Sequence, residues 1–430
     1  MQAVLENQAL CPQRRDESAL YRDESNESCI FIPENRDIDV ISRNSNSRGD
    51  VAIRRVVEHL SEVVKILDAA LMHDTRKAHS YGELLAAKLD VDREVRQARA
   101  VRAVLAKMPG PAVGASSTGI KAPLDAENTL AIVDVTSAEQ LPIDELVLHP
   151  YVRDRLDDFL ESVRMHDTWA ANGVAASNRL LIYGPPGTGK TSIAARIAKD
   201  LQLPLVLSRS DALMSSLLGQ TSRNLRTVFD FSASMPCVLF LDEFDALAKN
   251  RGDSREIGEL QRVVISLLQN IDAMDPSMIL VAATNHPQLL DSAVWRRFDY
   301  TLKVDLPVDA ERTSIWRNTL GQFAPADTEL GRLVDLSDGL SGAAIKSAAN
   351  DMCRVAMKQG GDVLTLPTML RRLARVLWFD SYDKFHDGAS EIAALRQWAP
   401  DVFTVRALSQ SFGVSTRQVS NAIGGTTASA

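Results

Sequence analysis

Residues 181–191 read LIYGPPGTGKT and match the pattern G-x-x-x-x-G-K-T. An apolar run, residues 179–183, leads into the match, and a helix-like run, residues 192–201, follows it. This order predicts a phosphate-binding loop, because glycines let backbone N–H groups approach an anion at the positive end of a helix. A glycine- and proline-rich surface turn is the alternative, and the strand and helix on either side disfavour it. The stretch therefore predicts a nucleoside triphosphate site.

Two side chains of the loop suit phosphate and metal binding. Lys190 offers a positive charge to the β- and γ-phosphates, and Thr191 offers a hydroxyl to Mg²⁺. The predicted cofactors are therefore ATP and Mg²⁺. The nucleotide-binding residues predicted in this loop are Gly184, Pro185, Pro186, Gly187, Thr188, Gly189, Lys190, Thr191 and Ser192.

A second apolar run, CVLFL at residues 237–241, predicts a buried strand that ends at Asp242 and Glu243. A carboxylate at the carboxyl end of a strand beside the phosphate loop can hold Mg²⁺ through its waters, which suits Asp242. Glu243 is placed to polarise the attacking water as a general base. The alternative is an ordinary strand end with acidic residues that cap the next helix. The phosphate-binding loop upstream favours the catalytic interpretation.

A third run, MILVAA at residues 278–283, predicts another strand, and Thr284 and Asn285 follow it. An asparagine at this strand end can orient the attacking water or sense the γ-phosphate. Arg296 and Arg297 come next, and guanidinium groups suit phosphate recognition because they are planar, always charged and bidentate. If the protein forms a ring, these arginines would reach the γ-phosphate bound by a neighbouring subunit.

The motifs GPPGTGKT, FLDEFD, ATN and WRRFD, in this order, strongly resemble those of the AAA+ ATPases and of their AAA clade. Residues 204–231 resemble the second strand, first pore loop and following helix of that clade. Residues 338–345, DGLSGAAI, resemble its lid motif, and the resemblance covers about residues 147–375. It implies an α/β fold, with a three-layer P-loop NTPase core built on a parallel sheet and an all-α lid.

The resemblance also implies an ATP-driven, Mg²⁺-dependent homo-oligomeric ring, usually hexameric, that remodels or threads a polypeptide. The implied roles are phosphate and metal binding for Lys190 and Thr191, metal positioning for Asp242, water activation for Glu243, first sensor for Asn285, action on the neighbour's nucleotide for Arg296 and Arg297, and contact with the adenine side for Gly342 and Ala343.

Two positions depart from the clade's pattern. The first pore loop has Leu217-Leu218-Gly219 where the clade places an aromatic residue, an aliphatic residue and Gly. Leucine offers less contact area than an aromatic ring, so either the grip on a threaded chain is weaker or the ring moves a specific folded partner. Ala344 stands where the lid motif usually has Asp, which puts in doubt any contact made by that Asp.

The composition fits two or three domains in a chain of 430 residues. A formal net charge of −8 argues against bulk electrostatic binding to nucleic acid or anionic lipid. The four cysteines are scattered without a C-x-x-C pair, which indicates free thiols in a reducing compartment. With no apolar run of about 20 residues and no signal-peptide pattern, we expect no membrane contact and a cytoplasmic location.

The N-terminal part contains helical signals. Apolar residues recur at three- and four-residue steps over residues 51–72, which predicts an amphipathic helix, and a second helix is predicted from about residue 81 to residue 107. We expect this hairpin to dock a protein partner, a substrate or a sister subunit. Its arginine stripe indicates a solvated face, with a binding surface as the alternative. The stripe consists of Arg93, Arg96, Arg99 and Arg102.

Residues 404–423, TVRALSQSFGVSTRQVSNAI, predict two short helices. Gly413 suits a left-handed C-cap, and Ser415 with Gln418 makes a capping box. The spacing resembles bacterial DNA-binding helix-turn-helix units, in which the start of the second helix reads the major groove of duplex DNA. Few basic side chains lie nearby, and a protein-docking module is the alternative. The residues that would face DNA are Thr416, Arg417, Gln418 and Asn421.

These signals divide the chain into segments and leave three functions open. The predicted segments are a mobile polar arm (1–50), a helical N-terminal module (51–110), a linker (111–145), a large nucleotide-binding subdomain (146–308), a helical lid (309–380) and a C-terminal module (381–430). The first function is a protein-remodelling ATPase, the second a DNA-tethered ATPase, and the third a binder in which ATP only switches assembly. Glu243 and the paired arginines argue against the third.

Overall fold

The computed structural model describes residues 59–107, 123, 131–142, 146–174, 178–209, 218–248, 257–361, 363–378 and 387–426. The predicted polar arm, most of the predicted linker and Leu217 of the predicted pore loop lie outside these residues. Leu218 is the first residue of helix α8.

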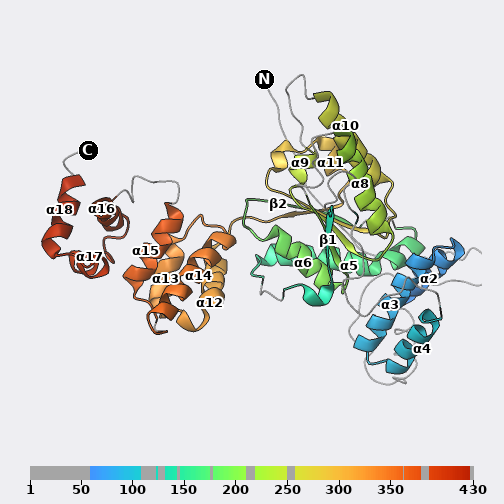
Figure 1. Cartoon of the computed structure of the whole chain (residues 1–430), viewed down its shortest axis with the longest axis horizontal. Helices are drawn as coiled ribbons and strands as arrows, with labels where there is room; N and C mark the ends of the chain where they lie inside the picture. The colour runs from blue at the N-terminus through green and yellow to red at the C-terminus, as the bar shows by residue number, and fades with distance from the viewer. Residues whose placement is uncertain are drawn as a thin grey trace, which may run out of the picture. The chain divides into compact units, whose positions relative to one another are not determined.

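A six-stranded sheet forms the centre of the large subdomain among the described residues (Figure 1). Its order is β1-β3-β4-β5-β2-β6, and all neighbours pair in parallel except β1 and β3. The predicted α/β fold is thus confirmed, with one antiparallel edge strand. The strands are β1 (Val133–Thr136), β2 (Arg179–Tyr183), β3 (Leu205–Ser208), β4 (Val238–Leu241), β5 (Ile279–Thr284) and β6 (Tyr300–Lys303).

Two apolar clusters cover the two faces of this sheet, as the alternation of strand side chains requires. In β4, Leu239 and Leu241 pack on one face with helices α8 and α10, while Val238 and Phe240 pack on the other face with α5 and α6. The result is the three-layer arrangement seen in Figure 1. The helices of this subdomain are α5 (Pro150–Ala171), α6 (Lys190–Asp200), α8 (Leu218–Ala233), α9 (Phe244–Ala248), α10 (Ile257–Asp272) and α11 (Ser292–Trp295), with short 3₁₀ turns η1 (Ala138–Gln140) and η2 (Pro287–Leu289).

The lid and the C-terminal helices share one hydrophobic core. Trp316 and Leu370 of the lid belong to the same buried cluster as Phe403, Leu408 and Val419. Two bidentate ion pairs join the same parts, Arg371 with Glu391 and Arg332 with Asp401. The helices are α12 (Asp309–Leu320), α13 (Asp327–Leu336), α14 (Gly342–Lys358), α15 (Leu366–Leu377), α16 (Gly388–Trp398), α17 (Val405–Phe412) and α18 (Thr416–Thr426), with the 3₁₀ turn η3 (Gly321–Phe323).

The turn between α17 and α18 has the predicted local geometry. Gly413 caps α17 with a φ of 65°, and the Ser415 backbone N–H donates to the Gln418 side chain at 2.9 Å. The Gln418 N–H donates in return to the Ser415 hydroxyl at 3.3 Å, so the capping box is present. The four side chains predicted to face DNA are exposed, and their role stays a prediction.

The N-terminal module has three described helices, so the prediction of one helix from residue 81 to residue 107 is wrong. The helices are α2 (Leu60–Leu71), α3 (Thr75–Val91) and α4 (Val95–Leu105). The chain reverses at Arg93, whose φ is 62°, because α4 folds back so that Ala98 packs with Leu85 and Leu89 of α3. Helix-forming residues on both sides of the turn hide this break in the sequence.

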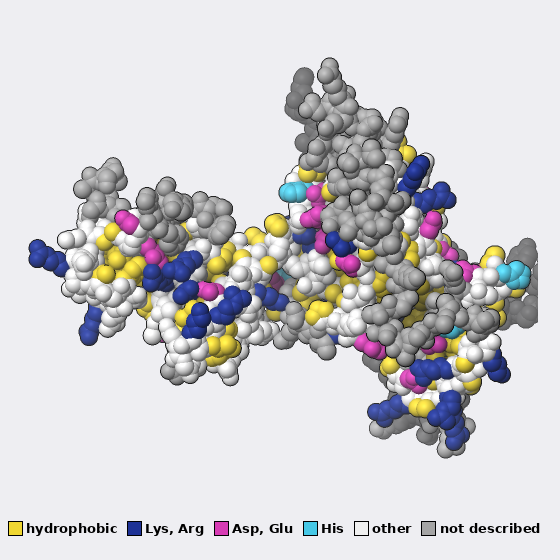
Figure 2. Space-filling model, in the orientation of Figure 1, with side chains coloured by type: hydrophobic (Ala, Val, Ile, Leu, Met, Phe, Trp, Pro, Cys, Tyr) yellow, Lys and Arg dark blue, Asp and Glu magenta, His cyan; other side chains and the backbone are white. Residues whose placement is uncertain are grey.

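The arginine stripe is divided by the same turn. Arg93 lies in the turn, whereas Arg96, Arg99 and Arg102 are exposed on α4, and Arg102 pairs with Asp90 at 2.5 Å. Lys and Arg side chains are spread over α3 and α4 in Figure 2, which agrees with a solvated face. No helix in the described ranges combines the length and the apolar character that crossing a bilayer would need.

Candidate nucleotide-binding site

The loop after β2 depends on glycine at two positions. A Cβ at Gly184, where φ is 152°, would lie 1.9 Å from the Val304 carbonyl oxygen on the connection after β6. A Cβ at Gly187, where φ is 75°, would lie 2.6 Å from the Ser341 hydroxyl of the lid. The first glycine therefore allows the loop to pass close to β6, and the second allows the lid to approach the loop.

Lys190 is the first residue of α6, and its side chain is buried under the loop. Its Nζ donates to the carbonyl oxygens of Gly184 and Pro185, both at 2.8 Å. Burial lowers the pKa of Lys190, and the carboxylates of Asp242 and Asp245 oppose that shift. The ammonium group thus lies inside the curve of the loop, where it suits an anion.

Thr191 and Asp242 come together across the sheet edge. The Thr191 hydroxyl donates to Oδ2 of Asp242 at 2.9 Å, although the residues belong to α6 and to the end of β4. A hydroxyl and a carboxylate are hard oxygen donors of the kind that Mg²⁺ takes in nucleotide sites, so the pair fits that ion. The other carboxylate oxygen of Asp242 accepts from the Glu243 N–H at 2.9 Å.

Glu243 has a strained backbone, with a φ of 50° that is uncommon for a residue other than glycine. Its side chain is exposed and lines the same cavity as Thr191 and Asp242. Strain of this kind concentrates at functional sites when the surroundings enforce it. The turn from β4 into α9 therefore presents the carboxylate to the cavity.

A buried hydroxyl ties this turn to the end of β5. Thr284, fully buried, donates from Oγ1 to Oδ1 of Asp245 at 2.7 Å and accepts from the His286 N–H at 3.0 Å. Asn285 lies between Thr284 and His286 and lines the cavity. Sequence reasoning missed this bridge, because a Thr in an apolar strand and an Asp in an acidic motif give no signal that they meet.

The lid contacts the loop directly. The Ala343 N–H donates to the Gly187 carbonyl at 3.0 Å, and the Ser341 hydroxyl caps α14 by accepting from Ala344 N at 3.3 Å. Ala344, which stands where the clade's lid motif usually has Asp, lies in the first turn of α14 and does not line the cavity.

These elements enclose a cavity of about 340 Å³. The predicted site residues that line it are Pro186, Gly187, Thr188, Gly189, Lys190, Thr191, Ser192, Asp242, Glu243, Asn285, Gly342 and Ala343. Sequence reasoning missed the rest of the lining, which is Leu146, Val147, Ile315, Asn318, Thr319 and Lys346. The residues from α12 have helical spacing, but the sequence gave no sign of which helix face would turn toward the loop.

Arg296 and Arg297 lie outside this cavity lining. Arg297 is held within its own chain, since its guanidinium donates to both carboxylate oxygens of Asp272 at 3.1 Å and to the Ala293 carbonyl at 3.1 Å. Arg296 is exposed at the end of α11 and has no ion pair in the described part of the chain.

Fold and site together define a P-loop nucleoside triphosphatase domain, in which the phosphate loop, the Thr191–Asp242 pair and the acidic strand end surround one cavity. Residues 180–306 match the family described as ATPase family associated with various cellular activities, AAA. This part of the chain is therefore an AAA family ATPase domain, which confirms the predicted enzyme class.

Three relatives illustrate the match. An uncharacterized AAA family ATPase, y4kL, of Sinorhizobium fredii is 49% identical over 34% of this chain and 45% of its own length. A proteasome-activating nucleotidase of Methanopyrus kandleri is 27% identical over 59% of this chain and 61% of its own length. The ATP-dependent zinc metalloprotease FtsH 3 of Sphaerobacter thermophilus is 29% identical over 52% of this chain and 47% of its own length. The chain spans about half the length of these curated relatives.

Proposed function

We propose that this protein is a Mg²⁺-dependent, ring-forming ATPase that remodels a protein partner. The observation that carries the proposal is the single cavity in which the phosphate loop, Asp242, Glu243, Asn285 and the lid residue Ala343 meet. Its donors suit each part of a nucleoside triphosphate: backbone N–H groups and Lys190 for the phosphates, and apolar lid residues for the base.

The proposed reaction follows from these groups. Glu243 accepts a proton from a water molecule as the water oxygen bonds to the γ-phosphorus. The bond between the γ-phosphorus and the bridging oxygen breaks, which gives ADP and inorganic phosphate. Asn285 orients the water, and Lys190 stabilises negative charge on the phosphate oxygens. Thr191 and Asp242 would hold Mg²⁺, which supplies charge neutralisation on the β- and γ-phosphates when bound.

The proposed ring, which the family resemblance implies to be hexameric, needs groups that act between subunits. Arg296 is the better placed of the two arginines, because it is exposed while Arg297 is bonded to Asp272. We keep both as trans-acting groups and expect different contributions. Arg296→Ala should retain ATP binding and remove turnover, whereas Arg297→Ala should also loosen the contact between α10 and α11.

Partner recruitment is proposed for residues 51–107 and for the pore loop at Leu217 and Leu218. One relative is named a proteasome-activating nucleotidase and another an ATP-dependent zinc metalloprotease. Both names support a protein as the partner of this ATPase. Helix α2 adds support, because it exposes Val64, Leu67 and Leu71 by 48%, 58% and 78% while burying Glu62 on its other side. An apolar stripe of this kind suits a protein surface.

Steady-state ATP turnover over a range of protein concentrations tests the ring. Turnover per subunit should rise cooperatively with concentration and depend on Mg²⁺. Adding Arg296→Ala subunits to wild type should reduce activity out of proportion to their fraction, because each Arg296 acts on the nucleotide of a neighbouring subunit. Turnover that is independent of concentration, with loss only proportional to the mutant fraction, would refute assembly-dependent catalysis.

An unfolded protein such as casein probes partner recruitment. We expect it to stimulate turnover of the wild type, and the double variant Leu67→Asp with Leu71→Asp to lose stimulation while keeping basal turnover. Met357→Asp is the matched control, since Met357 is also an exposed apolar residue but lies on α14, outside residues 51–107. Equal stimulation of all variants would exclude α2 as the docking surface.

Duplex DNA tethering is the second candidate, and the exposed polar start of α18 is the observation that favours it. Deleting the C-terminal module is a poor test, because Phe403, Leu408 and Val419 belong to the lid core. The surface variants Arg417→Ala and Asn421→Ala test it better. Salt-dependent retention on duplex DNA that both variants weaken would support tethering, and no retention of the wild type would exclude it.

A cytoplasmic location stays part of the proposal. It rests on the cysteine pattern, and the two described cysteines are free thiols. Burial raises the pKa of Cys237 to about 12, so this thiol is unreactive and packs as a small apolar side chain.

A further inference from the structure

One arginine stands where the sheet connects to the lid. β6 ends at Lys303, α12 begins at Asp309, and Arg312 lies in the first turn of α12 with only 4% of its surface exposed. A buried guanidinium is costly unless its donors are paired, so its partners show what it holds together.

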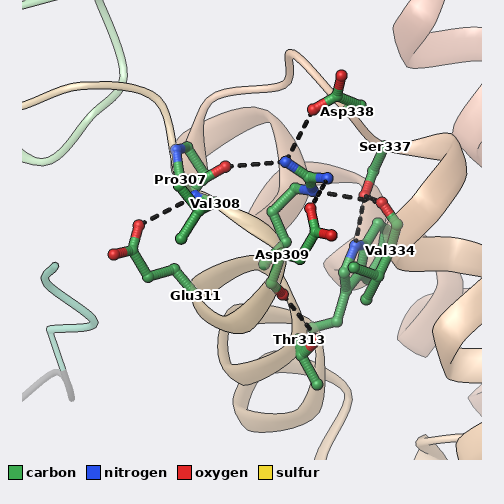
Figure 3. A network of polar contacts seen from close by, with 10 residues as sticks. Pro307, Val308, Asp309, Glu311, Thr313, Val334, Ser337 and Asp338 are labelled. Carbon is green, nitrogen blue, oxygen red and sulfur yellow. Dashed lines mark hydrogen bonds and ion pairs between the residues drawn. The ribbon is translucent and has the colours of Figure 1, made fainter.

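Its partners come from both sides of the connection. Within the connecting segment and α12, Nη1 donates to the Pro307 carbonyl at 3.0 Å and Nη2 to Oδ1 of Asp309 at 2.6 Å. From the far side of the lid, Nε donates to the Val334 carbonyl at 3.3 Å, and Nη1 pairs with Oδ1 of Asp338 at 2.9 Å. Figure 3 shows these groups converging on the guanidinium.

Asp338 opens the loop that touches the phosphate-binding loop. Ser337, just before it, is fully buried, accepts from Trp316 Nε1 at 3.0 Å and donates to the Val334 carbonyl at 3.0 Å. The loop then continues to Ser341, which caps α14, and to Ala343, whose N–H donates to the Gly187 carbonyl. Arg312 is thus joined to the lid contact through a short, well-anchored piece of chain.

We propose that Arg312 is a positioning residue, which acts through Asp338 to hold the lid loop against Gly187 and so sets nucleotide affinity. This inference rests on the proposed nucleotide site. The arginine fork is suited to the role because it satisfies several acceptors at fixed angles, which a lysine does not. Asp309 serves only the first turn of its own helix.

The two aspartates provide a matched pair for the test. Both pair with Arg312, and their side chains are 82% exposed for Asp309 and 80% for Asp338, so truncation of either leaves the core intact. We expect Asp338→Ala to weaken binding of a non-hydrolysable ATP analogue about threefold to tenfold, and Asp309→Ala to change it less than about twofold. Asp338→Asn keeps an acceptor oxygen and should recover part of the loss.

The controls separate the outcomes. Lys190→Ala, which removes the loop's ammonium, should abolish analogue binding and so shows that the titration measures this cavity. If the wild type does not bind the analogue, the proposed nucleotide function fails. If the wild type binds but Asp338→Ala and Asp309→Ala have equal affinities, whatever their melting temperatures, the positioning role of Arg312 is refuted.

Discussion

The buried hydroxyl of Thr284 offers a demanding test of how the site is held. Thr284→Val keeps the shape of the side chain and removes the atom that bonds Asp245 at 2.7 Å and His286 N at 3.0 Å. A hydrogen bond to a charged group contributes about 1.5–3 kcal/mol, and the lost acceptor for His286 adds about 1 kcal/mol. The free energy of unfolding should therefore fall by about 2.5–4 kcal/mol. A domain whose free energy of unfolding is about 5–15 kcal/mol remains folded after such a loss.

The catalytic effect should exceed the effect on binding. Asn285 lies between Thr284, whose hydroxyl donates to Asp245, and His286, whose N–H donates to the same hydroxyl. Loss of these bonds should let Asn285 shift, and a shift of about 1 Å in a catalytic group can cost about 100-fold in rate. We expect Thr284→Val to lower turnover at saturating ATP by at least about tenfold and to change ATP affinity by less than about twofold.

Steady-state kinetics, a nucleotide titration and thermal melting measure these quantities on one preparation. Thr284→Ser restores the hydroxyl without the methyl group and should regain most of the turnover. If Thr284→Val turns over like the wild type, or if Thr284→Ser is as defective as Thr284→Val, the bridge does not position Asn285.

Three other predictions concern the loop and the lid. Lys190→Ala should abolish nucleotide binding in a titration with a fluorescent ATP analogue, and retained affinity would contradict the placement of its ammonium. Gly184→Ala should prevent correct folding, because its Cβ would overlap the Val304 carbonyl, and a native melting temperature would show that the backbone can shift. Arg371→Met should lower the melting temperature, because it loses the bidentate pair with Glu391, and should leave nucleotide affinity unchanged, because neither residue lines the cavity. An unchanged melting temperature would deny that pair a role in stability.

Much of the site could be predicted because its parts are local in sequence. The loop at residues 184–191 carries its own strand and helix, and Asp242 and Asn285 follow directly after runs that form β4 and β5. Parallel strands place their carboxyl ends at one sheet edge, so motifs distant in the chain had to meet there.

The rest depends on tertiary packing, which leaves no local mark. Arg93 turns the chain within a run of helix formers because Ala98 packs back on α3. The sequence around Arg312 does not distinguish it from an arginine on the surface of a helix, because its burial and its four partners are evident only in the folded chain. The C-terminal helices read as a separate module, whereas Leu408 and Val419 complete the core of the lid.

Glu243→Gln is the decisive variant for the proposed hydrolysis, because it replaces one carboxylate oxygen of the proposed general base and leaves the cavity in place. ATP binding and steady-state turnover of this variant and of the wild type should be measured side by side, with Mg²⁺ present. If Glu243 is the base, we expect unchanged or tighter ATP binding and a loss of turnover of about 100-fold or more. Turnover at the wild-type rate with normal ATP binding would contradict it, since hydrolysis would then not use the carboxylate that β4 presents to the cavity.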